Sequence, residues 1–310
     1  MTGPTSSETV AEVMEPKRPA ALHAPEVGRR GGVVPYLLSL PGMVWLGIFF
    51  FVPLVTLAIT SLSVNTGSVY VPSLQMRWEW SNFTDAFDAY GTEFLRSFWY
   101  AAVATVAALV LGYPLAYFIA FRAGRLKHLL LGLVILPFFV TFLLRTLAWK
   151  TIVADDGTIV GMLETLGALP SEDRLLSTSW AVIGGLTYNF LPFMVLPIYV
   201  SLEKIDARLL DAARDLYADG LHTLRRVVLP LSLPGVFAGS LLTFIPAAGD
   251  FINAQYLGGP NQQMVGNVIQ TEFITIKDYP LAAALSFVLM LLILLGVLAY
   301  AKVLGTEDIT

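Results

Sequence analysis

The sequence predicts an all-α integral membrane protein with six transmembrane helices. Hydrophobic residues make up 56% of its 310 residues and charged residues only 14%, whereas a soluble domain usually has roughly 45–50% and 25%. The mean hydropathy is +0.69, and the apolar residues gather in runs long enough to cross a bilayer. These three observations exclude a soluble domain.

Six apolar runs are candidate spans, since a helix needs about 20 residues to cross a hydrocarbon core of about 30 Å. They cover residues 34–62, 95–121, 129–149, 179–202, 232–256 and 280–303. Residues 1–31 are rich in Pro, Ala, Glu and Thr and almost free of aromatic residues, which predicts a disordered tail. We therefore expect a transmembrane domain over residues 32–304, with tails at 1–31 and 305–310.

The charges between the runs predict the orientation. Acidic residues dominate the first, third and fifth connections. Basic residues precede the first run and fill the second and fourth connections, and cytoplasmic loops carry such an excess of Lys and Arg. Both termini and the 206–228 segment are therefore predicted to be cytoplasmic. The basic residues are Arg29, Arg30, Arg122, Arg125, Lys127, Lys204, Arg208, Arg214, Arg225 and Arg226.

The residues that most catalytic or metal sites require are scattered or missing. Cysteine is absent, which excludes disulfides and thiolate sites. The three histidines lie far apart, and no Ser-His-Asp set or Gly-rich phosphate loop is visible. We therefore expect no metal, no cofactor and no catalytic residue in this chain. A secondary transporter usually buries several titratable groups near the midplane, and this chain offers essentially Asp250.

The segment 206–228 is amphipathic and separates two long apolar runs. Its apolar residues recur every three or four positions, which places them on one helical stripe. Such a ridge can insert into a groove on another protein, or it can lie on the membrane surface. Nearly balanced charges weaken adsorption to anionic lipid and favour a protein partner. The stripe is Leu210, Ala213, Tyr217, Leu221, Leu224 and Val228.

The spacing in this segment resembles the EAA loop of ABC importer permeases. That pattern is E-A-A, three residues, G, nine residues, I, one residue, L-P; this chain has Asp211, Ala212, Ala213, Tyr217, Val227, Leu229 and Pro230 there. Tyr217 departs most, because a positive φ at the position of the family's Gly would cost it roughly 1–2 kcal/mol. We therefore expect the elbow to be rebuilt around Asp219-Gly220, with Asp219 capping the second helix.

Residues 136–149 and 244–261 are similar to spermidine/putrescine permeases of the B/H branch. The resemblance runs from Pro35 to the end of the sixth span and implies a type I importer permease bundle, the MetI-like fold. Iron, sulfate and sugar phosphate permeases share this architecture and remain alternatives. The segment's ATPase-coupling residues would be Asp211, Ala212, Ala213, Leu216, Tyr217, Asp219, Gly220, Leu221 and Leu224.

The resemblance also implies where the chain works and with which partners. It would form half of a pore in the bacterial cytoplasmic (inner) membrane, in contact with lipid, and would catalyse no reaction itself. A second permease, which the resemblance implies is a different chain, would complete the pore. Two ATPase subunits would bind ATP and Mg, and an extracytoplasmic binding protein would deliver the substrate. No nucleic acid partner is expected.

Charged and polar residues inside the predicted spans are candidates for the translocation pathway, because each is costly in hydrocarbon. Asp250 is the strongest candidate for contact with a cationic substrate, and a structural ion pair with Arg145 is its alternative. Arg145 is expected to hold carbonyl groups or an acid. Asn189 and Tyr188 can line the pathway or join helices by hydrogen bonds. Trp149 is expected to anchor the helix at the membrane interface.

Overall fold

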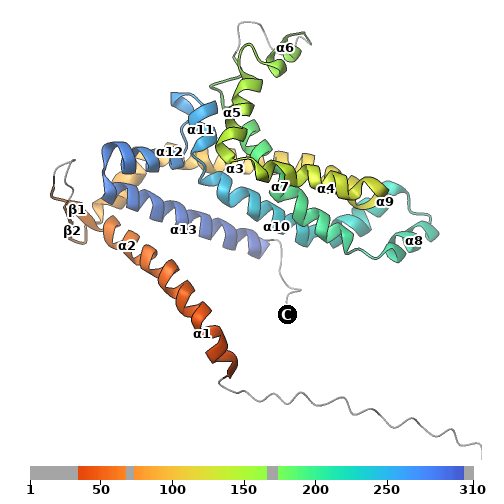
Figure 1. The fold of residues 1–310 in the computed structure, drawn as a ribbon, viewed down its shortest axis with the longest axis horizontal. Coiled ribbons are helices and arrows are strands. Elements are labelled where there is room, and N and C mark those ends of the chain that lie inside the picture. Colours follow the sequence, from red (N-terminus) through yellow and green to blue (C-terminus); the bar gives the residue numbers. More distant parts are fainter. Residues whose placement is uncertain (1–33, 68–72, 166–173, 304–310) are drawn as a thin grey trace, which may run out of the picture. The chain divides into compact units, whose positions relative to one another are not determined.

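The computed structural model describes residues 34–67, 73–165 and 174–303 and is mostly helical (Figure 1). Both predicted tails, 1–31 and 305–310, lie outside the described residues. Within the described ranges five helices are long and apolar enough to cross a membrane, or six if one bent pair counts as a single span. The predicted all-α membrane fold is confirmed. The spans are Leu38–Ser61, Ser81–Phe121, Ser179–Glu203, Gly220–Ala248, Tyr279–Lys302 and the pair Gly124–Phe139 with Phe142–Val153.

The chain divides into two compact units, residues 1–52 and 53–310. The described part of the first unit holds α1 (Val34–Leu46) and a π-helical turn, η1 (Gly47–Phe51). Helix α2 (Val52–Ser61) begins at the boundary. In the second unit, strands β1 (Ser63–Asn65) and β2 (Leu74–Met76) form an antiparallel hairpin with Val64 opposite Gln75.

Four long helices form the bundle of the second unit: α3 (Ser81–Phe121), α7 (Ser179–Glu203), α10 (Leu229–Ala248) and α13 (Tyr279–Val303). Helix α7 packs against both α3 and α10. Glycines allow the close approach: a Cβ on Gly112 of α3 would lie 3.2 Å from the Val195 side chain, and one on Gly235 of α10 only 2.6 Å from the Pro197 carbonyl oxygen. Small residues are typical of membrane helix contacts because they let backbones approach.

Shorter helices connect the long ones. On the way from α3 to α7 the chain forms η2 (Gly124–Leu126), α4 (Lys127–Ile135), η3 (Leu136–Phe139), α5 (Phe142–Val153) and α6 (Thr158–Thr165). After α7 come α8 (Ala207–Asp215), α9 (Gly220–Thr223) and η4 (Leu224–Val228). Between α10 and α13 lie α11 (Ile252–Leu257), η5 (Pro260–Gln262), α12 (Val265–Gln270) and η6 (Thr271–Ile276).

The connections between the long helices lie at the two ends of the bundle. They divide between the ends as the charges of the loops predict. At one end, Lys127 Nζ after α3 lies 2.5 Å from Glu203 Oε1 at the end of α7. At the other end, the Tyr90 hydroxyl lies 2.5 Å from Glu272 Oε1, and Arg96 donates to the Gln263 carbonyl at 2.8 Å. The second and fourth connections therefore share one face of the bundle, and the segments around α12 share the opposite face with the start of α3.

Three of the predicted spans have wrong boundaries. The second begins at Ser81 rather than at 95, with a non-helical Tyr90 inside it, because hydropathy marks the hydrocarbon crossing and not the helix end. The fifth span is predicted at 232–256. Its helical run instead covers Gly220–Ala248, and the chain then breaks before α11 because the Asp250 carboxylate accepts the N–H of Asn253 and starts a new helix.

The third predicted span, 129–149, is not one helix. Helices α4 and α5 are bent by 101° at the break between them. Pro137 lies in the 3-10 turn η3 and has no N–H to donate. Val140 and Thr141 follow in extended conformations, with ψ values of 136° and 144°. Both residues have β-branched side chains, which favour that conformation.

Candidate functional site

The EAA-like segment forms an elbow between α8 and α9. Tyr217 lies at its centre with φ of 57°, in the left-handed region. The N–H of Ala218 donates to the Ala213 carbonyl at 3.0 Å, the bond that closes a Schellman motif around a left-handed residue. The expected rebuilding around Asp219-Gly220 is therefore wrong. Tyr217 itself adopts the left-handed conformation expected at the position of the family's Gly, and it is 97% exposed.

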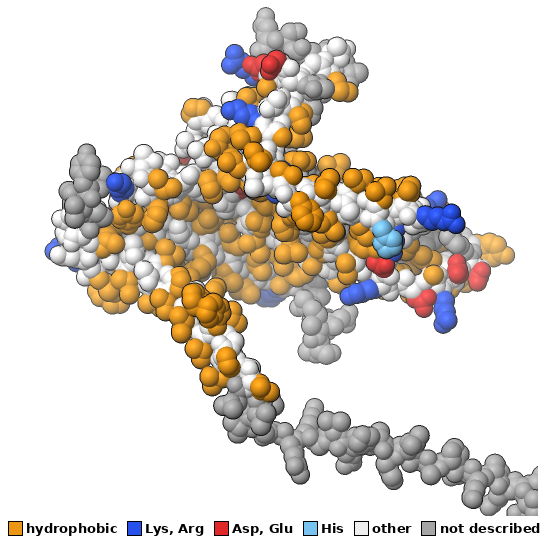
Figure 2. Space-filling model, in the orientation of Figure 1, with side chains coloured by type: hydrophobic (Ala, Val, Ile, Leu, Met, Phe, Trp, Pro, Cys, Tyr) orange, Lys and Arg blue, Asp and Glu red, His pale blue; other side chains and the backbone are white. Residues whose placement is uncertain are grey.

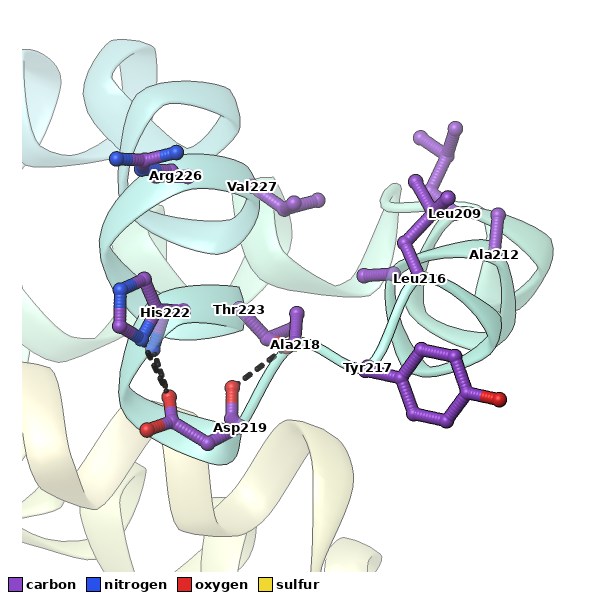
Figure 3. Close-up of a pocket in the computed structure, with 11 residues that line it drawn as sticks. Leu209, Ala212, Leu216, Tyr217, Ala218, Asp219, His222, Thr223, Arg226 and Val227 are labelled. Carbon is purple, nitrogen blue, oxygen red and sulfur yellow. Dashed lines mark hydrogen bonds and ion pairs between the residues drawn. The ribbon is translucent and has the colours of Figure 1, made fainter.

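Asp219 caps α9, as predicted. Its Oδ1 accepts the backbone N–H of His222 at 2.7 Å and lies 2.9 Å from the His222 ring Nδ1 (Figure 3). These hydrogen bonds from His222 hold the pKa of the Asp219 carboxyl below its usual value. The cap fixes the direction in which α9 leaves the elbow.

A groove of about 620 Å³ lies between α8 and α9. Leu209 and Ala212 of α8 and Leu216 just after it border the groove on one side, and His222 and Val227 lie on the opposite side (Figure 3). Figure 2 shows acidic and basic side chains around this end of the bundle. The groove is therefore apolar on the α8 side and has a charged border.

The predicted single ridge over 206–228 is wrong. The left-handed residue turns the chain, so a stripe drawn through one helix does not stay on one face. Leu210, Leu224 and Val228 pack toward α3 and α7, whereas Tyr217 is 97% exposed and Leu221 54%. Sequence reasoning missed Leu209, although its spacing of seven residues from Leu216 is a helical spacing that aligns the two side chains.

The predicted pathway residues lie in a different place, where α5, α7 and α11 meet. Asn189 on α7 is fully buried and donates from Nδ2 to Thr146 Oγ1 of α5 at 3.1 Å and to Asn253 Oδ1 of α11 at 3.0 Å. Arg145 Nη1 donates to the Asn189 carbonyl at 3.2 Å. Asn189 thus joins three helices, one of the two roles expected for it. Sequence reasoning missed Thr146 and Asn253, although an Asn within an apolar run is a signal.

This polar cluster holds four buried atoms without a hydrogen-bond partner among the described residues. They are Arg145 Nε, Trp149 Nε1, Asn189 Oδ1 and Asn253 Nδ2. Trp149, which is expected to anchor its helix at the membrane interface, packs on α7. Its ring stacks on Tyr188 with centroids 5.4 Å apart, and a Cβ on Gly184 would meet it at 3.3 Å.

Asp250 is 7% exposed and lies in the break between α10 and α11, not within a span helix. Its Oδ2 accepts the Asn253 N–H at 2.7 Å. The salt bridges of the described residues do not include one between Asp250 and Arg145, so the alternative of a direct ion pair is wrong for this structure. The described residues also contain no group of three or more side chains suited to hold a metal ion.

Residues 108–303 match the family model described as the inner membrane component of binding-protein-dependent transport systems. The chain belongs to this family. The permease is 39% identical over 257 residues to the spermidine/putrescine transport system permease protein PotB of Escherichia coli, covering 83% of this chain and 92% of that one. The PotB of Haemophilus influenzae is 38% identical over 260 residues, covering 83% and 90%.

Another relative is similar to the permease in sequence, and two solved structures are similar to it in fold. The inner membrane ABC transporter permease YdcU of Escherichia coli is 33% identical over 288 residues, covering 88% of the permease and 90% of YdcU. A bacterial alginate ABC transporter aligns with TM-score 0.65 at 18% identity, covering 89% of the permease and 96% of that chain. The MetNI methionine ABC transporter aligns with TM-score 0.54 at 17% identity, covering 69% and 93%. The permease therefore has the predicted type I ABC importer fold.

Replacing Tyr217 by Gly should stabilise the elbow, because Gly adopts the left-handed conformation without the cost that a Cβ brings, about 1 kcal/mol. We expect amide hydrogen exchange in α8 and α9 to slow about fivefold. Tyr217→Val is the control: a β-branched residue is strained there and should speed exchange. Equal exchange in the wild-type and Gly proteins would show that Tyr217 is not strained.

Proposed function

We propose that this permease forms half of the translocation pore of an ATP-driven importer of polyamines such as spermidine and putrescine. The observation that carries the proposal is the identity of 38–39% to PotB proteins over 83% of the chain. The permease itself catalyses no reaction in this proposal. ATP and Mg bind to a pair of partner ATPase subunits, a second permease completes the pore, and an extracytoplasmic binding protein delivers the substrate.

The elbow groove is the proposed contact with the ATPase. Leu209, Ala212 and Leu216 would receive an apolar segment of the ATPase while the surrounding charges orient it. From the elbow, a helical run of 29 residues, Gly220–Ala248, leads without interruption to the break at Asp250. Movement of the elbow would thus be carried along a stiff rod of roughly 43 Å. A rigid-body switch of this kind can tip the pore between inward-open and outward-open states.

The proposed orientation places both termini, Lys127 and Arg214 in the cytoplasm, and Asp155 and Gly259 outside. The natural chain has no cysteine, so single cysteines can be introduced and labelled with a membrane-impermeant thiol reagent. Positions 155 and 259 should react in intact cells, and positions 127 and 214 only after the cells are opened. Reaction of position 214 in intact cells would reverse the orientation.

Leu216→Asp should uncouple transport from ATP hydrolysis. Leu216 is 82% exposed in the isolated chain, and a docked ATPase would bury the new carboxylate without a partner at a cost of several kcal/mol. We expect substrate-stimulated ATP hydrolysis in proteoliposomes to fall at least tenfold. Leu216→Met, which keeps an apolar side chain of similar size, should retain it. Normal stimulation in the Asp variant would mean that the groove does not contact the ATPase.

Asp250 is the proposed acidic contact for a substrate ammonium group. Asp250→Asn keeps an oxygen that can accept the Asn253 N–H but removes the charge, so polyamine uptake should fall severalfold while the complex still assembles. Asp250→Ala also removes the cap and should impair assembly. Radiolabelled uptake and copurification measure the two effects separately. Unchanged uptake by the Asn variant would remove Asp250 from the pathway, and uptake of anions or sugars instead of polyamines would refute the substrate class.

A further inference from the structure

A second groove lies where α3 ends and the chain turns toward α4. Its volume is about 700 Å³, and it shares no lining residue with the elbow groove. The last turns of α3 and the first residue of η4 form its walls. Arg122 is the one charged residue among those that line it, and the others are apolar or aromatic. The lining residues are Tyr113, Pro114, Tyr117, Phe118, Arg122 and Leu224.

The groove follows one face of a membrane span to the end of that span. Pro114, Phe118 and Arg122 succeed one another at four-residue intervals, which places them on one stripe of α3. The distance from Tyr113 to Arg122 is roughly 14 Å along the helix axis. The apolar residues belong to the span Ser81–Phe121, and Arg122 directly follows it. The groove therefore lies at the depth of lipid acyl chains, and its charged end lies at the depth of headgroups.

The charged residues at the end of α3 and in the connection after it are basic. Residues 95–154 contain no Asp or Glu, and Arg122 and Arg125 are exposed. Arg225 of η4, which directly follows Leu224, is exposed as well. The salt bridges of the described residues include none of these three arginines. A guanidinium binds phosphate through charge-assisted hydrogen bonds, so a bound phosphate would supply the negative charge that this end of α3 lacks.

An anionic phospholipid matches both parts of this groove. Its acyl chain fits the apolar stripe, where Phe118 is 49% exposed, and its phosphate meets Arg122. A headgroup with a net negative charge is also attracted by the neighbouring arginines. A soluble subunit matches only the charged end, because it binds outside the bilayer and does not reach Tyr113 and Pro114. An apolar helix of another membrane protein matches only the stripe, and it would leave Arg122 without a counter-charge.

We propose that this groove binds one anionic phospholipid, with an acyl chain against Tyr117 and Phe118 and the phosphate at Arg122. The lipid site is separate from the translocation pathway and from the elbow groove. The two grooves share η4 as a wall, because Leu224 lines the lipid site while Arg226 and Val227 line the elbow groove (Figure 3). The bound lipid would therefore support from the other side the segment that joins the elbow to α10.

Phosphatidylglycerol with a diazirine on one acyl chain tests the site in the complete transporter, reconstituted in nanodiscs of phosphatidylcholine. On irradiation we expect adducts on the peptide that carries Tyr117 and Phe118, in at least fivefold greater yield than from phosphatidylcholine with the same diazirine. Arg122→Gln should lower the phosphatidylglycerol yield to the phosphatidylcholine level, and Arg122→Lys should retain most of it. Arg125→Gln is the matched control, because Arg125 is exposed but does not line the groove. It should keep the wild-type yield.

Three results would overturn the lipid site. Equal yields from the two lipids on the wild-type protein would show that bulk lipid covers the groove. Adducts elsewhere on the permease but none on the end of α3 would show that another subunit covers it. Equal losses in Arg125→Gln and Arg122→Gln would reduce the effect to a general attraction of anionic lipid to this end of the bundle. None of these yields depends on polyamine uptake, so the lipid site and the proposed function can fail separately.

Discussion

The structure depends on one constraint, the pairing of backbone N–H and C=O groups where no water can replace the partner. It explains why the described chain is mostly long helix and why its departures from helix are few. At the elbow, the Ala218 N–H returns to the Ala213 carbonyl. Between α10 and α11, the Asp250 carboxylate receives the Asn253 N–H. At the α4–α5 bend, Thr141 provides no side-chain cap, and the Arg145 N–H donates to the Thr141 carbonyl.

Helix α7 packs closely against its neighbours in the helical bundle that carries these breaks. A Cβ on Gly235 would lie 2.6 Å from the Pro197 carbonyl, and one on Gly185 would lie 2.2 Å from Leu257 and 2.7 Å from Asn253 Oδ1. Such contacts leave no room for α10 or α11 to slide over α7 without repacking. Helices α10 and α11 are thus each held against α7 by close backbone or side-chain contact.

Sequence reasoning predicted the features that depend on hydropathy and charge. It missed those that depend on backbone conformation. The spans and the grouping of loops at two ends followed from apolar runs and from the positions of Lys and Arg. The 101° bend could not be predicted in this way. Residues 129–149 are apolar on both sides of it, and mean hydropathy does not depend on the backbone conformation of Val140. The Asp219 cap was predictable from local chemistry. The conformation of Tyr217 was not predictable. The free-energy cost of a left-handed conformation for Tyr does not show whether the hydrogen bonds around the residue compensate for that cost.

The buried polar cluster shows why a simple pairing rule for Arg145 and Asp250 failed. Arg145 donates to the Asn189 carbonyl, the Asn189 side chain donates to Asn253 Oδ1, and the Asn253 N–H donates to Asp250. The two charged residues are therefore bridged by Asn189 and Asn253, whose separate backbone and side-chain groups each make one of these bonds. Two opposite charges are thus stabilised inside the protein without contact. A direct ion pair would occupy the carboxylate, whereas the described salt bridges leave Asp250 without a cation, as its proposed contact with a substrate ammonium group requires.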